Sequence, residues 1–200
     1  MTTPQLPLGQ TPSQTVGPYF AYGLTPEQYN YPFASAFSAV LADGHAKGQA
    51  IEIVGQVFDG AGNTVGDALI EILQVDADGM PVTSVEQARR HGFTGFGRCG
   101  TGTEAGNQFR FRTVKPGVRQ PGEAPYIAVI VMMRGLLLHT FTRIYFGDEE
   151  AANAGDAVLA SVPAERRATL IAPREISGGL PVYRFDIHMQ GDQETVFFDL

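Results

Sequence analysis

Apolar side chains recur at every second position in several short segments after residue 50, and this period of two constrains the fold more than any other feature. Ile51, Ile53 and Val57 alternate with Glu52 and Gln56, which is typical of a strand with one buried face. Further strands are predicted at residues 68–75, 108–113, 126–133, 137–145, 182–190 and 194–198. Segments rich in Gly, Asp, Asn and Pro separate the strands and indicate turns, at residues 59–63, 76–79, 116–117 and 134–135.

Many short strands with such turns, and no regular alternation with helices, predict a mainly β sandwich with little helix. Helices are predicted at residues 32–41, after a possible N-cap at Asp148, and at residues 163–170. The first 25 residues are rich in Pro, Thr and Gln and show neither period. We therefore expect a single domain over residues 1–200, with an extended N-terminal arm at 1–25 and a β-sandwich core at 50–200.

Composition excludes several classes of protein. A net charge of -7 disfavours binding to nucleic acid, whose phosphates require a basic surface. The only cysteine is Cys99, so no intrachain disulfide is possible. Residues 1–10 do not have the pattern of a signal peptide, and the apolar run at residues 127–133 is too short to span a membrane. These features predict a cytoplasmic protein with no membrane segment.

Residues 53–65, IVGQVFDGAGNTV, and 67–79, DALIEILQVDADG, carry the most specific pattern. We interpret them as a hairpin in which Gly55, the one gap in the inward row, lets another backbone approach closely. The pattern resembles the signature of the intradiol ring-cleavage dioxygenases. Further segments resemble that family in the same order, at residues 11–19, 96–98, 113–117, 143–149, 183–187 and 191–199. The C-terminal segments are similar to the iron-free α chains of its heteromeric members.

The resemblance implies a metal site that this chain has lost. The catalytic chains of the family hold non-haem Fe(III) with two tyrosinates and two histidines. Here residues 80–94, where the first tyrosinate would lie, contain no tyrosine, and Pro81 replaces an aromatic residue. Arg119 occupies the second tyrosinate position, and Tyr126 and Ala128 occupy the histidine positions. An arginine would repel Fe(III). The resemblance therefore implies that Fe(III) is bound by a partner β subunit and that this chain binds no metal.

The resemblance also implies a function. The chain would be the α subunit of a larger α/β hetero-oligomer that cleaves 3,4-dihydroxybenzoate with O2 to 3-carboxy-cis,cis-muconate, a step of aromatic degradation in the β-ketoadipate pathway. It would hold no catalytic residue but would form part of the substrate-binding wall through Thr15, Gly17, Tyr19 and Arg134. Two roles stay open for Tyr19 and Arg134. They either contact the substrate, Arg134 through its carboxylate, or only anchor the arm and hold an acid at the interface.

Two alternatives to an α subunit stay open. One is a non-catalytic binding or scaffold module of the transthyretin-like type, which shares the first half of the signature. The other is a stand-alone dioxygenase with a rebuilt metal site, which the missing tyrosines disfavour. The four histidines, His45, His91, His139 and His188, are not at metal-ligand spacing. Residues 76–79 resemble the start of a calcium loop but lack its distal glutamate, so a turn is predicted there.

Overall fold

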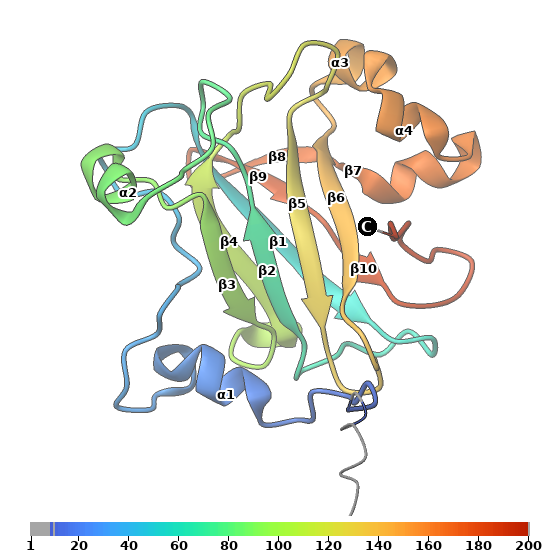
Figure 1. Cartoon of the computed structure of the whole chain (residues 1–200). Coiled ribbons are helices and arrows are strands. Elements are labelled where there is room, and N and C mark those ends of the chain that lie inside the picture. The colour runs from blue at the N-terminus through green and yellow to red at the C-terminus, as the bar shows by residue number, and fades with distance from the viewer. Residues whose placement is uncertain (1–8, 10, 200) are drawn as a thin grey trace, which may run out of the picture.

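The protein is a sandwich of two mixed β-sheets with short helices at its margins, as Figure 1 shows. The structure is a computed structural model that describes residue 9 and residues 11–199. The first sheet contains β1 (Ala50–Phe58), β4 (Gln108–Val114), β8 (Arg174–Ser177), β9 (Leu180–Arg184) and β10 (Ile187–His188). The second has the order β3 (Phe96–Gly100), β2 (Leu69–Leu73), β5 (Tyr126–Met132), β6 (Thr140–Phe146) and β7 (Ile171–Ala172). The predicted fold class is therefore confirmed.

Strand β1 is the centre of the first sheet because it pairs on both of its edges. Its register places Ile53 beside Phe111 of antiparallel β4 and beside Tyr183 of parallel β9. At Gly55 the chain between β9 and β10 crosses so closely that a Cβ atom would overlap the carbonyl oxygen of Phe185. This confirms the close approach predicted at Gly55, and it explains why a glycine interrupts the buried row.

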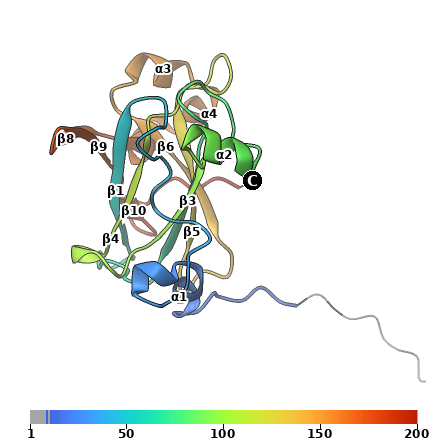
Figure 2. The same ribbon diagram turned by 90° about the vertical axis from the view of Figure 1, so that its left-hand side faces the viewer.

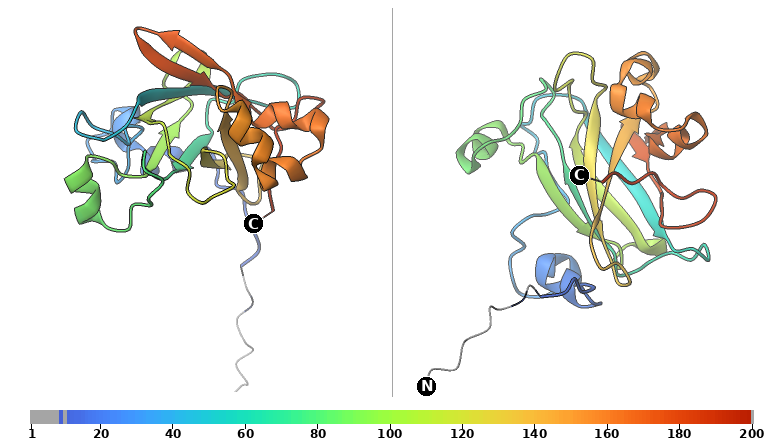
Figure 3. Two further views of the ribbon diagram at one scale, coloured as in Figure 1. Left: turned by 90° about the horizontal axis from the view of Figure 1, so that it is seen from above. Right: turned by 45° about the vertical axis from the view of Figure 1, so that its right-hand side comes forward.

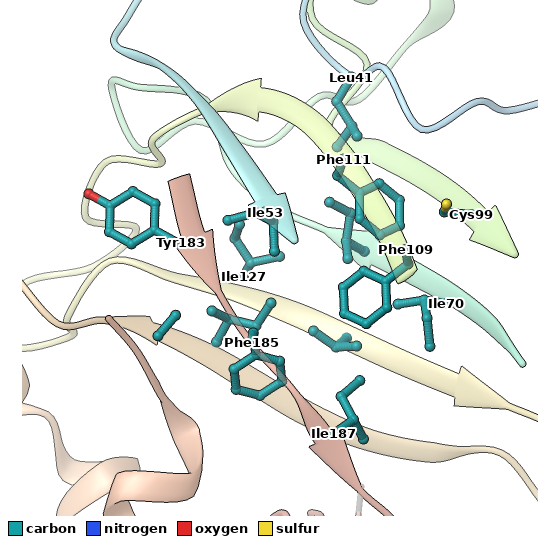
Figure 4. Packing of buried hydrophobic residues seen from close by; sticks show 14 of the residues in the cluster. Leu41, Ile53, Ile70, Cys99, Phe109, Phe111, Ile127, Tyr183, Phe185 and Ile187 are labelled. Atoms are coloured by element: carbon teal, nitrogen blue, oxygen red, sulfur yellow. The ribbon is translucent and has the colours of Figure 1, made fainter. Parts of the chain in front are cut away.

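The core lies between the sheets and consists of their inward-facing apolar side chains. Ile53 and Phe111 of the first sheet and Ile70 and Ile127 of the second are completely buried. Figure 4 shows these side chains meeting in the space between the strands, with Phe185 and Ile187 beside them. Burial of each such side chain contributes roughly 1.5 to 3 kcal/mol. The alternation seen in the sequence therefore decides which face of each strand points inward.

Most of the short helices lie outside the two sheets. The α-helices are α1 (Phe20–Leu24), α2 (Val85–His91), α3 (Glu150–Gly155) and α4 (Ala157–Ser161), and the 3-10 helices are η1 (Pro26–Tyr29), η2 (Ala105–Asn107) and η3 (Ala164–Leu170). Figure 3 shows α3 and α4 beside β6, where Leu159, Val162 and Leu170 bury Tyr145 in a second small core. No helix in the described residues is long and apolar enough to cross a membrane.

The predicted hairpin of residues 53–79 is wrong. Residues 59–63 do form a tight turn, since Phe58 bridges Thr64 and Val65 N–H donates to the Val57 carbonyl. The chain then leaves the first sheet, and β2 pairs with β3 and β5 of the second sheet rather than with β1. Burial explains the change, because β1 and β2 both carry apolar rows that must face each other across the core.

Some of the predicted helices are also wrong. Residues 32–41, all described by the structure, form no helix. They pass along the sandwich, with one single bridge at Val40 and another just beyond the range, at Ala42. The N-cap of α3 is Glu149 rather than Asp148, and the Asp148 side chain instead accepts a hydrogen bond from the Tyr183 hydroxyl. The helix predicted at residues 163–170 is present but is the 3-10 helix η3. Helices α2 and α4 were not predicted from the sequence.

Three predicted strands have different bounds. β6 begins at Thr140 rather than at residue 137, and Leu137 and Leu138 are exposed in the connection. The strand predicted at residues 182–190 divides into β9 and β10 where the chain crosses Gly55. Residues 194–198 form no strand and contribute a single bridge, between Phe198 and Phe141.

The N-terminal arm is partly as predicted. Residues 11–17 have no helix or strand, and Figure 2 shows the described part of the arm running out from one end of the sandwich. Residues 20–29 differ from the prediction, because α1 and η1 lie there and fold against that end. Thr25 N–H donates to the Ala21 carbonyl and closes α1. Residues 1–8 and 10 of the predicted arm lie outside the described residues.

Candidate functional site

The two ends of the sandwich carry different candidate sites. We call the end with the β4–β5 connection, residues 115–125, the cavity end. We call the other end, with the β5–β6 connection at 133–139 and with residues 11–31, the arm end. Figure 1 shows β5 running from the first to the second. At about 3.3 Å per residue along a strand, Arg134 lies roughly 20 Å from Ala128, so the two sites are separate.

A cavity of about 300 Å³ opens at the cavity end. Its apolar walls are Leu73, Val75, Pro81, Val82, Phe96 and Ala128, and the backbones of Gly95 and Gly117 complete them. Its polar side chains are Gln74, Thr94, Arg119 and Tyr126. The cavity thus gathers Arg119, Tyr126 and Ala128, which the family resemblance aligns with ligand positions, together with residues from both ends of the tyrosine-free loop. The resemblance implied that these positions lie together.

Close backbone packing fixes one edge of this cavity. Gly117 N–H donates to the Asp76 carbonyl at 2.9 Å. A Cβ atom at Gly117 would lie 2.5 Å from the Ala77 carbonyl oxygen, so no other residue fits without a backbone shift. The Asp76 carboxylate accepts from the N–H groups of Asp78 and Met80, each at 2.9 Å. The turn predicted at residues 76–79 is therefore confirmed, and its position holds the β4–β5 connection.

Charged groups hold the first part of the same connection. Lys115 is 14% exposed, and its Nζ lies 3.0 Å from Asp148 Oδ2 and 2.6 Å from Glu149 Oε1. The Tyr183 hydroxyl donates to the Asp148 carboxylate at 3.0 Å. Burial alone would lower the pKa of Lys115, but the hydrogen bonds to Glu149 and Asp148 outweigh it and raise that pKa. Lys115 thus faces the start of α3 rather than the cavity, and its role is structural.

The far part of the connection is held by Asp156. Its carboxylate accepts from Ala124 N–H at 2.9 Å, from the Tyr145 hydroxyl at 3.1 Å and from Leu159 N–H at 2.8 Å. Burial raises the pKa of Tyr145 to about 12, so its hydroxyl keeps its proton and continues to donate. Both ends of the connection that carries Arg119 are therefore fixed to the sandwich.

Two of the four polar side chains of the cavity form hydrogen bonds to other groups of the protein. The Gln74 amide donates to the Val114 carbonyl at 2.9 Å and accepts from the Thr113 hydroxyl at 2.8 Å. The Thr94 hydroxyl donates to the Phe96 carbonyl at 2.8 Å. Arg119, which is 47% exposed, has the Glu123 carboxylate within 3.4 Å of its Nε. Arg119 and Tyr126 are therefore the groups left to meet a ligand.

These residues do not fit Fe(III). The cavity offers one phenol, that of Tyr126, beside a guanidinium that is always charged. Ferric ions in proteins require several anionic or imidazole donors at once, and a fixed cation beside them opposes binding. Across the described part of the chain, no three His, Cys, Asp or Glu side chains lie close enough together to hold a metal ion. His45 lies near Asp43, His139 packs on Phe141, and His188 stacks on Phe58.

At the arm end, the structure brings Thr15 to the turn that carries Arg134. Gly135 N–H donates to the Thr15 hydroxyl oxygen at 3.1 Å. Gly17 has a φ of 76°, a conformation that favours glycine over every other residue. Tyr19 is 75% exposed, and its ring lies 5.9 Å from that of Tyr22. The predicted arm residues therefore present polar and aromatic groups to solvent at this end.

Arg134 is 63% exposed and forms an ion pair with Asp67, with its Nε 2.5 Å from Asp67 Oδ2. Asp67 was not singled out from the sequence. It lies between β1 and β2, and only the crossing of the chain between sheets brings it to the β5–β6 connection. An exposed guanidinium with one carboxylate partner retains free N–H donors. Arg134 can therefore bind a second anion while Asp67 limits its orientation.

Comparison with known proteins identifies the family. The sequence profile of a family described as "Dioxygenase" matches residues 17–135. A protocatechuate 3,4-dioxygenase alpha chain from Burkholderia cepacia is 59% identical over 194 residues, which cover 96% of this chain and 98% of that protein. One from Pseudomonas putida is 42% identical over 200 residues, covering 96% and 97%. A beta chain from Burkholderia cepacia is 27% identical over 208 residues, covering 97% and 85%.

A solved structure also has this fold. The dioxygenase domain of a dioxygenase and carbohydrate-binding fusion protein from Streptomyces sp. SirexAA-E aligns with a TM-score of 0.61 at 23% identity, over 82% of this chain and 94% of that one. The chain belongs to the intradiol ring-cleavage dioxygenase family. Within that family, it is more similar to these two alpha chains of protocatechuate 3,4-dioxygenase, at 59% and 42% identity, than to the beta chain, at 27%. The resemblance seen in the sequence is confirmed.

Proposed function

We propose that this chain is the alpha subunit of a protocatechuate 3,4-dioxygenase and that a beta subunit supplies the iron. The observation that carries the proposal is the 59% identity to such an alpha chain over 98% of its length. The cavity supports it, because Arg119, Tyr126 and Ala128 cannot form a ferric site. The Fe(III) of the partner would supply the chemistry of ring cleavage, in which both atoms of O2 are added between the two hydroxyl-bearing carbons.

The residues of the arm end would act at the partner's site. Arg134 lies roughly 20 Å from Ala128 of the cavity, by the rise of β5, and Tyr19 lies on the arm at the same end as Arg134, so we place neither residue at that cavity. They are exposed, whereas core residues of the sandwich are not. Such exposed aromatic and arginine side chains are typical of interfaces. We therefore place the substrate site at an interface between this end and the beta subunit.

The chemistry of each arm-end residue suggests its part in binding. The substrate 3,4-dihydroxybenzoate carries a carboxylate, which the guanidinium of Arg134 can bind with two parallel hydrogen bonds. Asp67 restricts Arg134 to one side of the β5–β6 connection. Thr15 ties the arm to Gly135, which places Tyr19 and the turn in one structural unit. Tyr19 would add an aromatic face at the mouth of the site.

We further propose a larger α/β hetero-oligomer in the cytoplasm. A beta chain is among the relatives, and its similarity at 27% identity covers 97% of this chain, which supports one architecture for the two kinds of subunit. Related subunits of this kind commonly assemble with symmetry. Cys99 is a buried free thiol, which suits a reducing compartment.

Co-expression with a protocatechuate 3,4-dioxygenase beta chain tests the proposal. The full chain would be purified alone and together with the beta chain, and iron content, visible absorption and ring cleavage of 3,4-dihydroxybenzoate would be measured. We expect iron, the tyrosinate-to-iron colour and activity only in the complex. Iron and colour in the isolated chain would overturn the iron-free assignment. Failure to form a complex would favour a binding or scaffold module instead.

The substrate role of Arg134 has its own test. In the α/β complex, Arg134→Ala should raise KM for 3,4-dihydroxybenzoate about tenfold or more and change kcat less, because a charge-assisted hydrogen bond to the substrate is lost. Arg112→Ala is the matched control, since Arg112 is exposed on β4 of the other sheet. An unchanged KM in Arg134→Ala would leave Arg134 only the ion pair with Asp67.

A further inference from the structure

We infer that the cavity at the cavity end is a binding site for a small aromatic carboxylate, which it holds without a metal and without chemical change. This inference rests on the cavity itself and does not depend on the proposed function. The cavity lies at the opposite end of β5 from Arg134. Its size, its charge, its two aromatic rings and its rigid frame all favour such a ligand.

The size and walls of the cavity suit a single ring. Its volume of about 300 Å³ lies at the lower end of the range of about 300 to 1,000 Å³ for small-molecule sites. Leu73, Val75 and Ala128 offer aliphatic surface, and Phe96 and Tyr126 offer aromatic surface. Aromatic rings prefer offset or edge-on contact with other rings. An aromatic ligand would therefore gain more here than an aliphatic one of equal size.

The charge of the cavity selects an anion. Arg119 is its one charged side chain, and no Asp or Glu lines it among the described residues. Gln74 and Thr94 already form hydrogen bonds within the protein, so no ligand is needed to satisfy their polar groups. Glu123 lies 3.4 Å from Nε of Arg119 but is not part of the cavity wall. Since a guanidinium has five N–H donors, Arg119 can pair with Glu123 and still bind a ligand carboxylate.

The cavity is held in shape before any ligand arrives. The Arg143 guanidinium lies 4.2 Å from the ring centre of Tyr126, which restricts that ring. Gly117 and Ala124 tie the connection carrying Arg119 to Asp76 and Asp156. A site that is already ordered loses less conformational entropy on binding. Metal cations are excluded by Arg119, and a phosphate dianion would need more donors than this one cation and one phenol provide.

Fluorine NMR of the full-length chain with 4-fluorobenzoate tests the inference. We expect saturable broadening of the probe signal, with weaker binding of neutral 4-fluorobenzyl alcohol. Arg119→Leu should weaken 4-fluorobenzoate binding roughly tenfold or more, because the charge-assisted hydrogen bonds are lost. Ala128→Phe should abolish it by filling the cavity. Glu123→Gln should leave it unchanged or tighten it, because a competing anion is removed.

The control is Arg112→Leu, which removes an exposed arginine from the other sheet, where it lines a different cavity. This variant should bind the probe as the wild type does. Absence of saturable binding, or binding that neither Arg119→Leu nor Ala128→Phe weakens, would overturn the inference. Loss of binding in Arg112→Leu alone would place the anion in the other cavity and would overturn it as well. None of these results bears on assembly with a beta subunit.

Discussion

The cavity end and the arm end are joined by the same strand, β5, yet they are built on opposite principles. At the cavity end, backbone contacts and partly buried charges fix a connection beside a cavity. At the arm end, most polar groups are exposed, and they are joined by one hydrogen bond and by the ion pair between exposed Arg134 and partly buried Asp67. The first is complete within this chain. The second has few contacts of its own and presents its groups outward, as a surface that needs a partner would.

The difference fits the proposal that a beta subunit holds the iron. Arg119, Tyr126 and Ala128 line a cavity but cannot form a ferric site there, and the frame of that cavity is also part of the fold. The proposed arm-end residues would act at the partner's site and would need no such frame in their own chain. The two ends should therefore respond differently to substitution.

The largest difference is expected from removing one cation at each end. Lys115→Met removes the ammonium that Asp148 and Glu149 share, and it leaves Asp148 with the Tyr183 hydroxyl and, at 3.7 Å, with Arg174. We expect a loss of about 2 kcal/mol or more in the free energy of unfolding, because Lys115 is only 14% exposed and pairs with both carboxylates. Arg134→Met removes a cation that is 63% exposed from a single carboxylate, that of Asp67, which is 20% exposed, and should cost about 1 kcal/mol. Urea denaturation of both variants measures the two values. Equal losses would contradict the contrast between a fixed end and an open end.

A glycine at each end gives a second, smaller contrast. Gly117→Ala places a Cβ atom 2.5 Å from the Ala77 carbonyl oxygen and should cost about 1 to 3 kcal/mol, since backbone must move. Gly17→Ala meets no atom within 4 Å among the described residues and strains only the local backbone, at φ 76°. It should leave the melting temperature unchanged. A lowered melting temperature in Gly17→Ala would show that the arm is part of the cooperative core.

The pH dependence of stability should also reside at the cavity end. Burial tends to raise the pKa of Asp148, but hydrogen bonds from Lys115 and Tyr183 outweigh it and hold that pKa below its ordinary value of 3.8. A carboxyl whose pKa is lowered on folding stabilises the protein above its ordinary pKa, and this stability is lost as the pH falls through the lowered value.

We therefore expect the urea midpoint of the wild type to fall between about pH 5 and about pH 3, partly because of Asp148. The urea midpoint of Lys115→Met should fall less over the same range, since its Asp148 keeps the Tyr183 hydrogen bond but has lost Lys115, which contributes most to lowering its pKa. The raised pKa of Lys115 predicts the opposite sign in alkali, where stability is lost as the pH rises through it. Parallel pH profiles of the two proteins in acid would refute this assignment.

The smallest expected effect concerns Thr15. Thr15→Val removes the acceptor for Gly135 N–H at an exposed position, and it should cost about 0.5 kcal/mol or less in global stability. The same change should speed proteolytic cleavage within residues 11–19, because the arm loses its link to the β5–β6 connection. Thr15→Ser, which keeps the hydroxyl, should be cleaved at the wild-type rate. Faster cleavage of both variants would argue against the hydrogen bond as the anchor.

The sequence by itself determined the sandwich, the inward row of β1, the close approach at Gly55 and the absence of iron ligands. These depend on residue identity at single positions, such as Arg119, or on a period of two that any half-buried strand must show. It also pointed to Arg119, Tyr126 and Ala128, which are among the residues that line the cavity, because the family resemblance aligned them with ligand positions.

Only the tertiary structure decided which strands pair. Local alternation indicates which face of a strand is buried but not which strand it pairs with. It therefore predicts a hairpin of β1 and β2, although the two strands face each other across the core. The helix predicted at residues 32–41 failed for a related reason, since Leu41 is buried by packing on the sandwich rather than along a helical face. Asp67 reached Arg134 only because the chain crosses between sheets. Long-range burial, which a short sequence window does not contain, made these choices.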